Sequence, residues 1–161
     1  MKSNPYSAFD YGAYILGLHD RSEKELYEKL LKKGYTPEES ASAMVKLADY
    51  GYVDDSRYAR HYAEQKLHSY GKRKVEYDLL YKGISPEIVS EILEELVDEE
   101  IIVDEIKTAI SKKLKGAVPE DRAQLKKLFD SFARKSYEYE LVKKAYNLYT
   151  EEIENIESEC I

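Results

Sequence analysis

The sequence predicts an all-α protein made of three tandem three-helix repeats that form an elongated, curved, solenoid-like body. Three observations predict this fold class. Only four prolines and seven glycines interrupt the 161 residues, so long stretches lack helix breakers. Apolar residues recur at helical spacing and do not alternate as in a strand. A nine-residue segment also recurs 49 residues later, which indicates a repeat unit of about 50 residues. Repeat units of about 50 residues are typically stable only when they stack on one another.

The repeated segment marks a turn between two helices. Leu30–Glu38 reads LLKKGYTPE and Leu79–Glu87 reads LLYKGISPE, with six of nine positions identical. A weaker third copy, FARKSYEYE, covers Phe132–Glu140. Gly34 and Gly83 can adopt the left-handed conformation that ends a helix, so each copy is expected to stop one helix there.

Each turn also contains the start of the next helix. Thr36 and Ser85 are the expected N-caps, because a hydroxyl can accept a hydrogen bond from a free backbone amide. Pro37 and Pro86 follow them at the first helical position, where the missing N–H costs nothing. Ser136 replaces the glycine in the third copy, so a less sharply specified turn is expected there.

Apolar stripes predict three helices in each repeat. The expected helices span residues 6–19, 23–33, 37–50, 56–69, 72–82, 86–99, 105–115, 120–134 and 139–156. The helix before each turn has an apolar face with i, i+1, i+4, i+5 spacing. This face comprises Leu26, Tyr27, Leu30 and Leu31, then Val75, Leu79 and Leu80, then Leu128, Phe129, Phe132 and Ala133. The repeats are expected to occupy residues 1–55, 56–104 and 105–161, the last with an acidic end.

Charge is segregated along the chain. The net charge of −7 argues against simple coating of DNA, because phosphate binding depends on lysine and arginine. Residues 107–149 nevertheless contain 11 basic and five acidic side chains, a local charge of +6. Nine acids and no base lie from Glu87 to Glu105, and five more acids lie from Glu151 to Glu159.

The basic residues of the third repeat are the best candidates for a surface that binds a partner or DNA, because acids are sparse around them. They are Lys112, Lys113, Lys115, Arg122, Lys126, Lys127, Arg134, Lys135, Lys143 and Lys144. A second basic run, Lys72, Arg73 and Lys74, begins a helix, where cations oppose the helix dipole. This unfavourable placement favours a functional reason. The alternative for each residue is an ordinary solvated helical face.

No motif indicates an enzyme, a cofactor or a metal. The sequence has no glycine-rich phosphate loop and no nucleophile with a catalytic partner. His61 and His68 lie seven residues apart on one helical face without a third ligand. The acidic run at 94–100 lacks the glycine turn of a calcium loop. We therefore expect a protein that is not an enzyme and uses neither cofactor nor metal.

The densest motif is GYVDDSRYA at Gly51–Ala59, on the first repeat boundary. Gly51 is expected to end one helix and Asp55 to cap the next, with Arg57 close enough to pair with Asp54. The adjacent carboxylates could also suggest metal or acid–base chemistry, but no nearby His, Cys or third acid supports that alternative. The side chains available to pack at this seam are Tyr52, Val53, Tyr58 and Ala59.

At these residues the chain resembles the RecX family, bacterial regulators of the RecA recombinase. The matching stretches are Arg21–Leu26 (RSEKEL), Lys29–Gly34 (KLLKKG), Gly51–Ala59 and Lys82–Ile84 (KGI). The resemblance covers most of the chain and is most specific in the first two repeats. Lys72 stands where the family usually has proline and Ser136 where it usually has glycine, which affects local turn geometry.

The resemblance implies a protein that docks into the groove of RecA filaments on single-stranded DNA. There it would modulate, usually downward, recombinase, ATPase and coprotease activity. We expect a cytoplasmic monomer with no membrane partner, since no apolar run approaches the length of a membrane span. Two alternatives stay open: a helical-repeat scaffold for protein–protein interaction unrelated to recombination, and a weak nucleic-acid-binding module formed by the third repeat.

Overall fold

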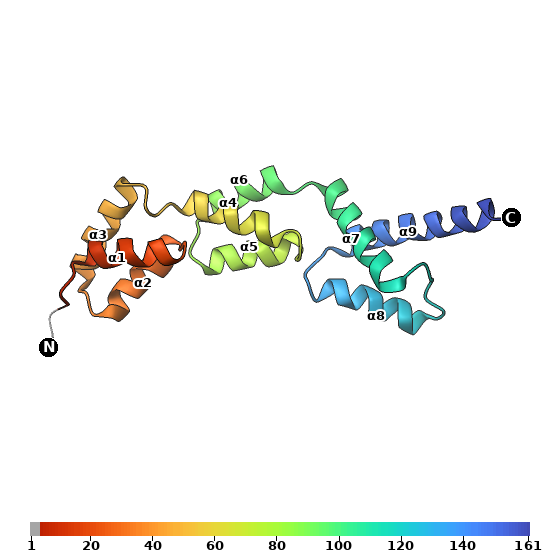
Figure 1. Cartoon of the computed structure of the whole chain (residues 1–161), viewed down its shortest axis with the longest axis horizontal. Coiled ribbons are helices and arrows are strands. Elements are labelled where there is room, and N and C mark those ends of the chain that lie inside the picture. Colours follow the sequence, from red (N-terminus) through yellow and green to blue (C-terminus); the bar gives the residue numbers. More distant parts are fainter. Residues whose placement is uncertain (1–3) are drawn as a thin grey trace. The chain divides into compact units, whose positions relative to one another are not determined.

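The computed structural model describes residues 4–161, which form nine α-helices and no strand (Figure 1). The predicted all-helical fold class is confirmed. The helices are α1 (Ala8–Leu18), α2 (Glu23–Lys33), α3 (Pro37–Asp49), α4 (Asp55–Lys66), α5 (Lys72–Tyr81), α6 (Pro86–Leu96), α7 (Glu99–Leu114), α8 (Arg122–Ala133) and α9 (Tyr139–Glu159). None of these helices has the length and apolarity needed to cross a membrane.

The helices form two compact bodies. The N-terminal body comprises the described residues up to Ala63 together with Glu76–Glu95, and the C-terminal body comprises Glu64–Val75 and Leu96–Ile161. The limits of the bodies fall inside α4, inside α5 and before the last residue of α6. The division of the sequence into repeats ending at residues 55 and 104 stays a prediction.

The repeated turn has the same backbone hydrogen bonds in all three copies. In the first copy the amide of Gly34 donates to the carbonyl of Leu31 (3.0 Å), and the amide of Tyr35 donates to the carbonyl of Leu30 (3.3 Å). The equivalent pairs are Gly83 to Leu80 (3.0 Å), Ile84 to Leu79 (3.1 Å), Ser136 to Ala133 (2.9 Å) and Tyr137 to Phe132 (3.2 Å). Ser136 therefore ends its helix as the glycines do, with a φ of 62°.

Local capping fixes the starts of α2 and α3, and the predicted cap at Thr36 is confirmed. Thr36 accepts a hydrogen bond from the amide of Glu39, whose side chain in turn accepts one from the amide of Thr36. Ser22 and Glu25 form the same reciprocal pair at the start of α2. Two amides at each helix start are thus satisfied by neighbouring side chains.

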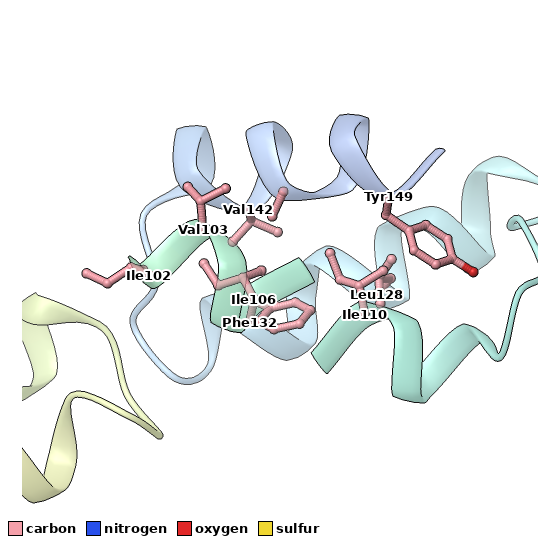
Figure 2. Close-up of a cluster of buried hydrophobic side chains, with 9 residues drawn as sticks. Ile102, Val103, Ile106, Ile110, Leu128, Phe132, Val142 and Tyr149 are labelled. Carbon is pink, nitrogen blue, oxygen red and sulfur yellow. The ribbon is translucent and has the colours of Figure 1, made fainter. Parts of the chain in front are cut away.

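The core of the C-terminal body is built from three helices (Figure 2). The buried side chains are Ile102, Val103, Ile106 and Ile110 of α7, Leu128 and Phe132 of α8, and Val142, Ala145 and Tyr149 of α9. The hydroxyl of Tyr149 donates to the carbonyl of Ala117 (2.8 Å), which ties the α7–α8 connection to α9. This tyrosine therefore fills the core with its ring and holds a loop with its polar end.

The start of α7 was predicted wrongly. The helix begins at Glu99, six residues before the expected start, whereas every other helix begins and ends within three residues of expectation. Asp98 caps it by accepting from the amides of Glu100 (2.9 Å) and Ile101 (3.3 Å). Ile102 and Val103 are buried in the core and stabilise the start of this helix. The acidic residues at 94–100 interrupt the apolar pattern there, so the sequence pattern does not predict the earlier start.

The predicted apolar stripe is also narrower than expected. Leu31 and Leu80 are 37% and 41% exposed, and Ala133 is exposed as well. The three residues occupy the same position before the repeated turn. That position therefore faces solvent in every copy.

Candidate binding surfaces

The GYVDDSRYA motif is a structural junction in the N-terminal body. Gly51 ends α3 in the left-handed conformation, with a φ of 71°. The α4 cap is Asp54, whose carboxylate accepts from the amide of Arg57 (3.1 Å), so the expected cap at Asp55 is wrong. The guanidinium of Arg57 donates to the carbonyls of Gly51 (3.0 Å) and Tyr52 (3.5 Å) rather than pairing with Asp54.

Asp55 reaches a different helix. Its carboxylate accepts from the amide of Glu23 (2.8 Å), so it satisfies a free N–H group in the first turn of α2. Burial raises the pKa of Asp55, the hydrogen bond from Glu23 lowers it, and the charges of Asp54 and Glu25 raise it further. Burial, followed by the charges of Asp55 and Asp54, likewise raises the pKa of Glu23. Asp55 thus joins α4 to α2, whereas Asp54 caps α4.

The tyrosines of the motif divide between core and surface. Tyr58 is buried with Val53 and Ala59, whereas Tyr52 is half exposed. The ring of Tyr52 lies 5.8 Å from that of Tyr50 and 6.3 Å from that of Phe9. Tyr52 therefore belongs to a small aromatic cluster on the surface rather than to the seam.

A second junction lies where the turn of the second repeat meets α2. The hydroxyl of Ser22 donates to the carbonyl of Lys82 (2.7 Å), and the ammonium of Lys82 pairs with Glu25 (2.7 Å). That ammonium also lies 5.8 Å and 5.5 Å from the ring centroids of Tyr58 and Tyr62. Burial lowers the pKa of Lys82, but its hydrogen bonds to Glu25 and Tyr58 outweigh this effect and raise it.

The C-terminal body has an equivalent junction. The amide of Gly71, just before α5, donates to the carbonyl of Lys135 (2.8 Å) in the turn of the third repeat. A Cβ atom at Gly71 would overlap the backbone carbonyl of Ser136 and lie 2.6 Å from the amide nitrogen of Tyr137. Only glycine fits this approach. Gly34, Gly51, Gly71 and Gly83 are therefore explained by turns and close contacts.

The ten basic candidates of the third repeat lie on three helices and in the turns that follow α7 and α8. All are exposed: Lys112 and Lys113 on α7, Lys115 directly after it, Arg122, Lys126 and Lys127 on α8, Arg134 and Lys135 in the turn after α8, and Lys143 and Lys144 on α9. Lys113 donates to the hydroxyl of Ser131 (2.8 Å), and Lys126 pairs with Asp130 (2.6 Å). Lys143 and Lys144 lie between the buried Val142 and Ala145 on α9, and their side chains project from that helix toward solvent.

One hollow brings two cations together beside apolar groups. Arg122 and Lys126 line a cavity of about 330 Å³ between α8 and the start of α9. Its other lining residues are Leu125, Phe129, Asp130, Ala133, Tyr137, Tyr139 and Val142. The lining of this hollow thus contains three aromatic rings, two cations and the carboxylate of Asp130.

The three basic residues at the start of α5, Lys72, Arg73 and Lys74, differ in their surroundings. Arg73 is exposed on α5, while the ammonium of Lys74 lies 5.9 Å from the ring centroid of Tyr70. Lys72 borders a small cavity next to Gly71 and Tyr137. Of these three residues, Arg73 is exposed to solvent, whereas Lys72 and Lys74 are partly buried.

Sequence reasoning missed a pair of tyrosines on α5. Tyr77 and Tyr81 are mostly exposed, and their rings stack with centroids 6.4 Å apart and an angle of 15° between the planes. Their four-residue spacing places them on one helical face. Comparison of equivalent positions in the three repeats could have found them.

The comparisons with known proteins agree with this architecture. The description "RecX, first three-helix domain" matches residues 8–54, and "RecX, second three-helix domain" matches residues 54–93. The regulatory protein RecX of Caldanaerobacter subterraneus subsp. tengcongensis is 33% identical over 128 residues, covering 79% of this chain and 62% of the relative. The chain belongs to the RecX family.

Other members extend the same relationship. The regulatory protein RecX of Clostridium tetani is 32% identical over 130 residues, covering 79% of this chain and 60% of the relative. The matched regions thus span about three fifths of these two curated RecX proteins. The crystal structure of RecX from Lactobacillus salivarius has the same fold, with a TM-score of 0.77 at 20% identity over 89% of this chain and 94% of that one.

Proposed function

We propose that this chain is a regulatory protein that binds RecA filaments on single-stranded DNA and lowers their ATPase, recombinase and coprotease activity. Membership of the RecX family, whose curated members are named regulatory proteins, is the observation that carries the proposal. We further propose that the chain acts in the cytoplasm as a monomer. Its action is binding rather than catalysis.

The electrostatics of the C-terminal body support an anionic partner. Residues 107–149 carry a local charge of +6 within a chain of net charge −7. Lys127, Lys143 and Lys144 are exposed there, so their charges are available to a partner. An acidic recombinase surface or the phosphates of bound DNA would be attracted to this region, more strongly at low salt.

The direct test is ATP hydrolysis by RecA on single-stranded DNA, titrated with the wild-type protein. A concentration-dependent fall in hydrolysis supports the proposal. An unchanged rate at micromolar excess removes it and leaves the helical-repeat scaffold as the function to pursue.

A further inference from the structure

The solvent side of α5 carries an exposed aromatic patch formed by Tyr77, Leu80 and Tyr81. The two tyrosines are 66% and 74% exposed, and Leu80 is 41% exposed. The near-parallel planes of the rings, 15° apart, leave flat aromatic surface open to solvent. Exposed apolar surface of this kind costs solubility and adds nothing to the core of the fold.

The other two repeats show that the fold does not need tyrosine at these positions. Counting back from the equivalent turn residues Gly34, Gly83 and Ser136 aligns the three helices. Tyr77 then corresponds to Glu28 and Asp130, and Tyr81 corresponds to Lys32 and Arg134. Charged side chains therefore occupy both positions in the first and third repeats, and aromatic side chains occupy them in the second repeat alone. The needs of folding therefore do not explain why the second repeat has tyrosines at these two positions.

A cation lies beside the stacked rings. The stem of Lys24 on α2 runs past Gly83, where an added Cβ would lie 2.7 Å from the Cβ of Lys24. Its ammonium donates to the carbonyl of Tyr81 (3.3 Å) and lies 5.7 Å from the centroid of the Tyr81 ring.

We propose that Tyr77 and Tyr81 form a stacking platform for the bases of single-stranded DNA, with Lys24 beside its phosphates. Flat rings beside a cation are the combination that single-strand-binding proteins use, because every base has a π face and every nucleotide a negative charge. This inference rests on the proposed function and deepens it by naming a contact for the DNA strand. A purely apolar protein contact would not require parallel rings with an adjacent cation.

The test measures binding of a fluorescein-labelled oligothymidylate to the full chain by fluorescence anisotropy. The key variant, Tyr77→Leu with Tyr81→Leu, keeps apolar side chains and removes the rings. Tyr77→Phe with Tyr81→Phe keeps the rings. Tyr6→Leu with Tyr14→Leu is the matched control, since it removes two other tyrosines that are 65% and 63% exposed.

The platform predicts that the leucine pair weakens binding about tenfold or more, while the phenylalanine pair and the control stay within about twofold of wild type. Circular dichroism should show all four proteins equally helical, because every substituted side chain is exposed. Wild-type affinity in the leucine pair, or no binding of the oligonucleotide by the wild type, overturns the proposal.

Two further outcomes distinguish the stacking platform from a protein contact and from the proposed function. A leucine pair that binds the oligonucleotide normally but is no longer retained on RecA filaments would make the patch a protein contact and overturn the platform. Ring-dependent oligonucleotide binding by a wild type that leaves RecA ATP hydrolysis unchanged would support the platform and remove the proposed function.

Discussion

The amide of Gly71 donates to the carbonyl of Lys135 at 2.8 Å, and the hydroxyl of Ser22, 49 residues before Gly71, donates to the carbonyl of Lys82 at 2.7 Å. Ser22 and Gly71 each lie at the start of the middle helix of a repeat. Lys82 and Lys135, which they contact, each directly precede the left-handed residue in the turn of the following repeat. The repeated turn thus both ends a helix and forms a contact within its body.

Gly71→Ala should destabilise the C-terminal body by about 3 kcal/mol, because the new methyl group would overlap the backbone of Ser136, which cannot move aside as a flexible side chain would. Urea unfolding followed by circular dichroism measures the change. The control is Gly17→Ala in α1, where an added Cβ meets nothing within 4 Å. That variant should be stabilised by up to about 1 kcal/mol through helix propensity. Similar stability of both variants would contradict the Gly71 contact.

Ser136→Gly should stabilise the protein by about 1 kcal/mol. Ser136 adopts a φ of 62°, a left-handed conformation that costs an L-residue about 1–2 kcal/mol and costs glycine little. The reverse change, Gly34→Ala, forces alanine into a φ of 107° and should destabilise by a similar amount. Urea midpoints give both values, and a destabilised Ser136→Gly would show that the serine side chain has a role of its own.

The turn at Ser136 shows what local sequence can and cannot predict. Gly34 and Gly83 identify their turns because glycine, cap and proline occur together, and the structure contains both. Ser136 lacks the glycine and proline, yet the same hydrogen bonds form because Gly71 and the core of the C-terminal body hold the turn. Long-range contact thus supplies what the local sequence does not specify.

Asp54→Ala should destabilise by about 1 kcal/mol through the lost cap of α4. Asp55→Ala should cost a similar amount, because it leaves the amide of Glu23 without its acceptor. Asp55→Asn keeps an oxygen acceptor and removes a charge that burial and neighbouring acids disfavour, as the raised pKa of Asp55 indicates. At neutral pH this variant should be at least as stable as wild type. An Asp55→Asn protein as unstable as Asp55→Ala would contradict this assignment.

The choice between Asp54 and Asp55 could not be made from sequence. Both residues are aspartates, which favour N-cap positions, and either could begin α4. The contact with Glu23, 32 residues before Asp55, decides the matter. The basic candidates could be named from sequence because charge follows directly from residue type. Their roles could not, because the partners of Lys113 and Lys126 are set by the three-dimensional structure.

Stability should fall as pH rises from about 10 to 12, in part through Tyr62. Burial and the hydrogen bond to Asp78 raise the pKa of Tyr62 from 10.0 to about 12. The folded protein therefore holds this proton more tightly than the unfolded chain, so the contribution is complete below pH 10 and is lost as pH approaches 12. Tyr62→Phe should flatten the decline in unfolding free energy. An unchanged slope in this variant would contradict the assigned shift.

Reversal of exposed cations should separate charge from fold. Lys127→Glu, Lys143→Glu and Lys144→Glu together change the charge of the C-terminal body by six units, two for each side chain. The matched control reverses Lys29, Lys32 and Lys46, three exposed lysines of the N-terminal body. The first variant should bind RecA filaments about tenfold or more weakly and with a flatter salt dependence. Equal weakening by both variants would point to net charge rather than to this surface.

The most direct measurement is retention of the wild-type protein on RecA filaments assembled with a nonhydrolysable ATP analogue on bead-bound single-stranded DNA. Beads carrying DNA alone and RecA without DNA serve as references. The proposed function predicts saturable retention on filaments well above both references, and release as salt is raised. Retention on filaments no greater than on bare DNA, across the same concentrations, would contradict a regulator that acts on the RecA filament.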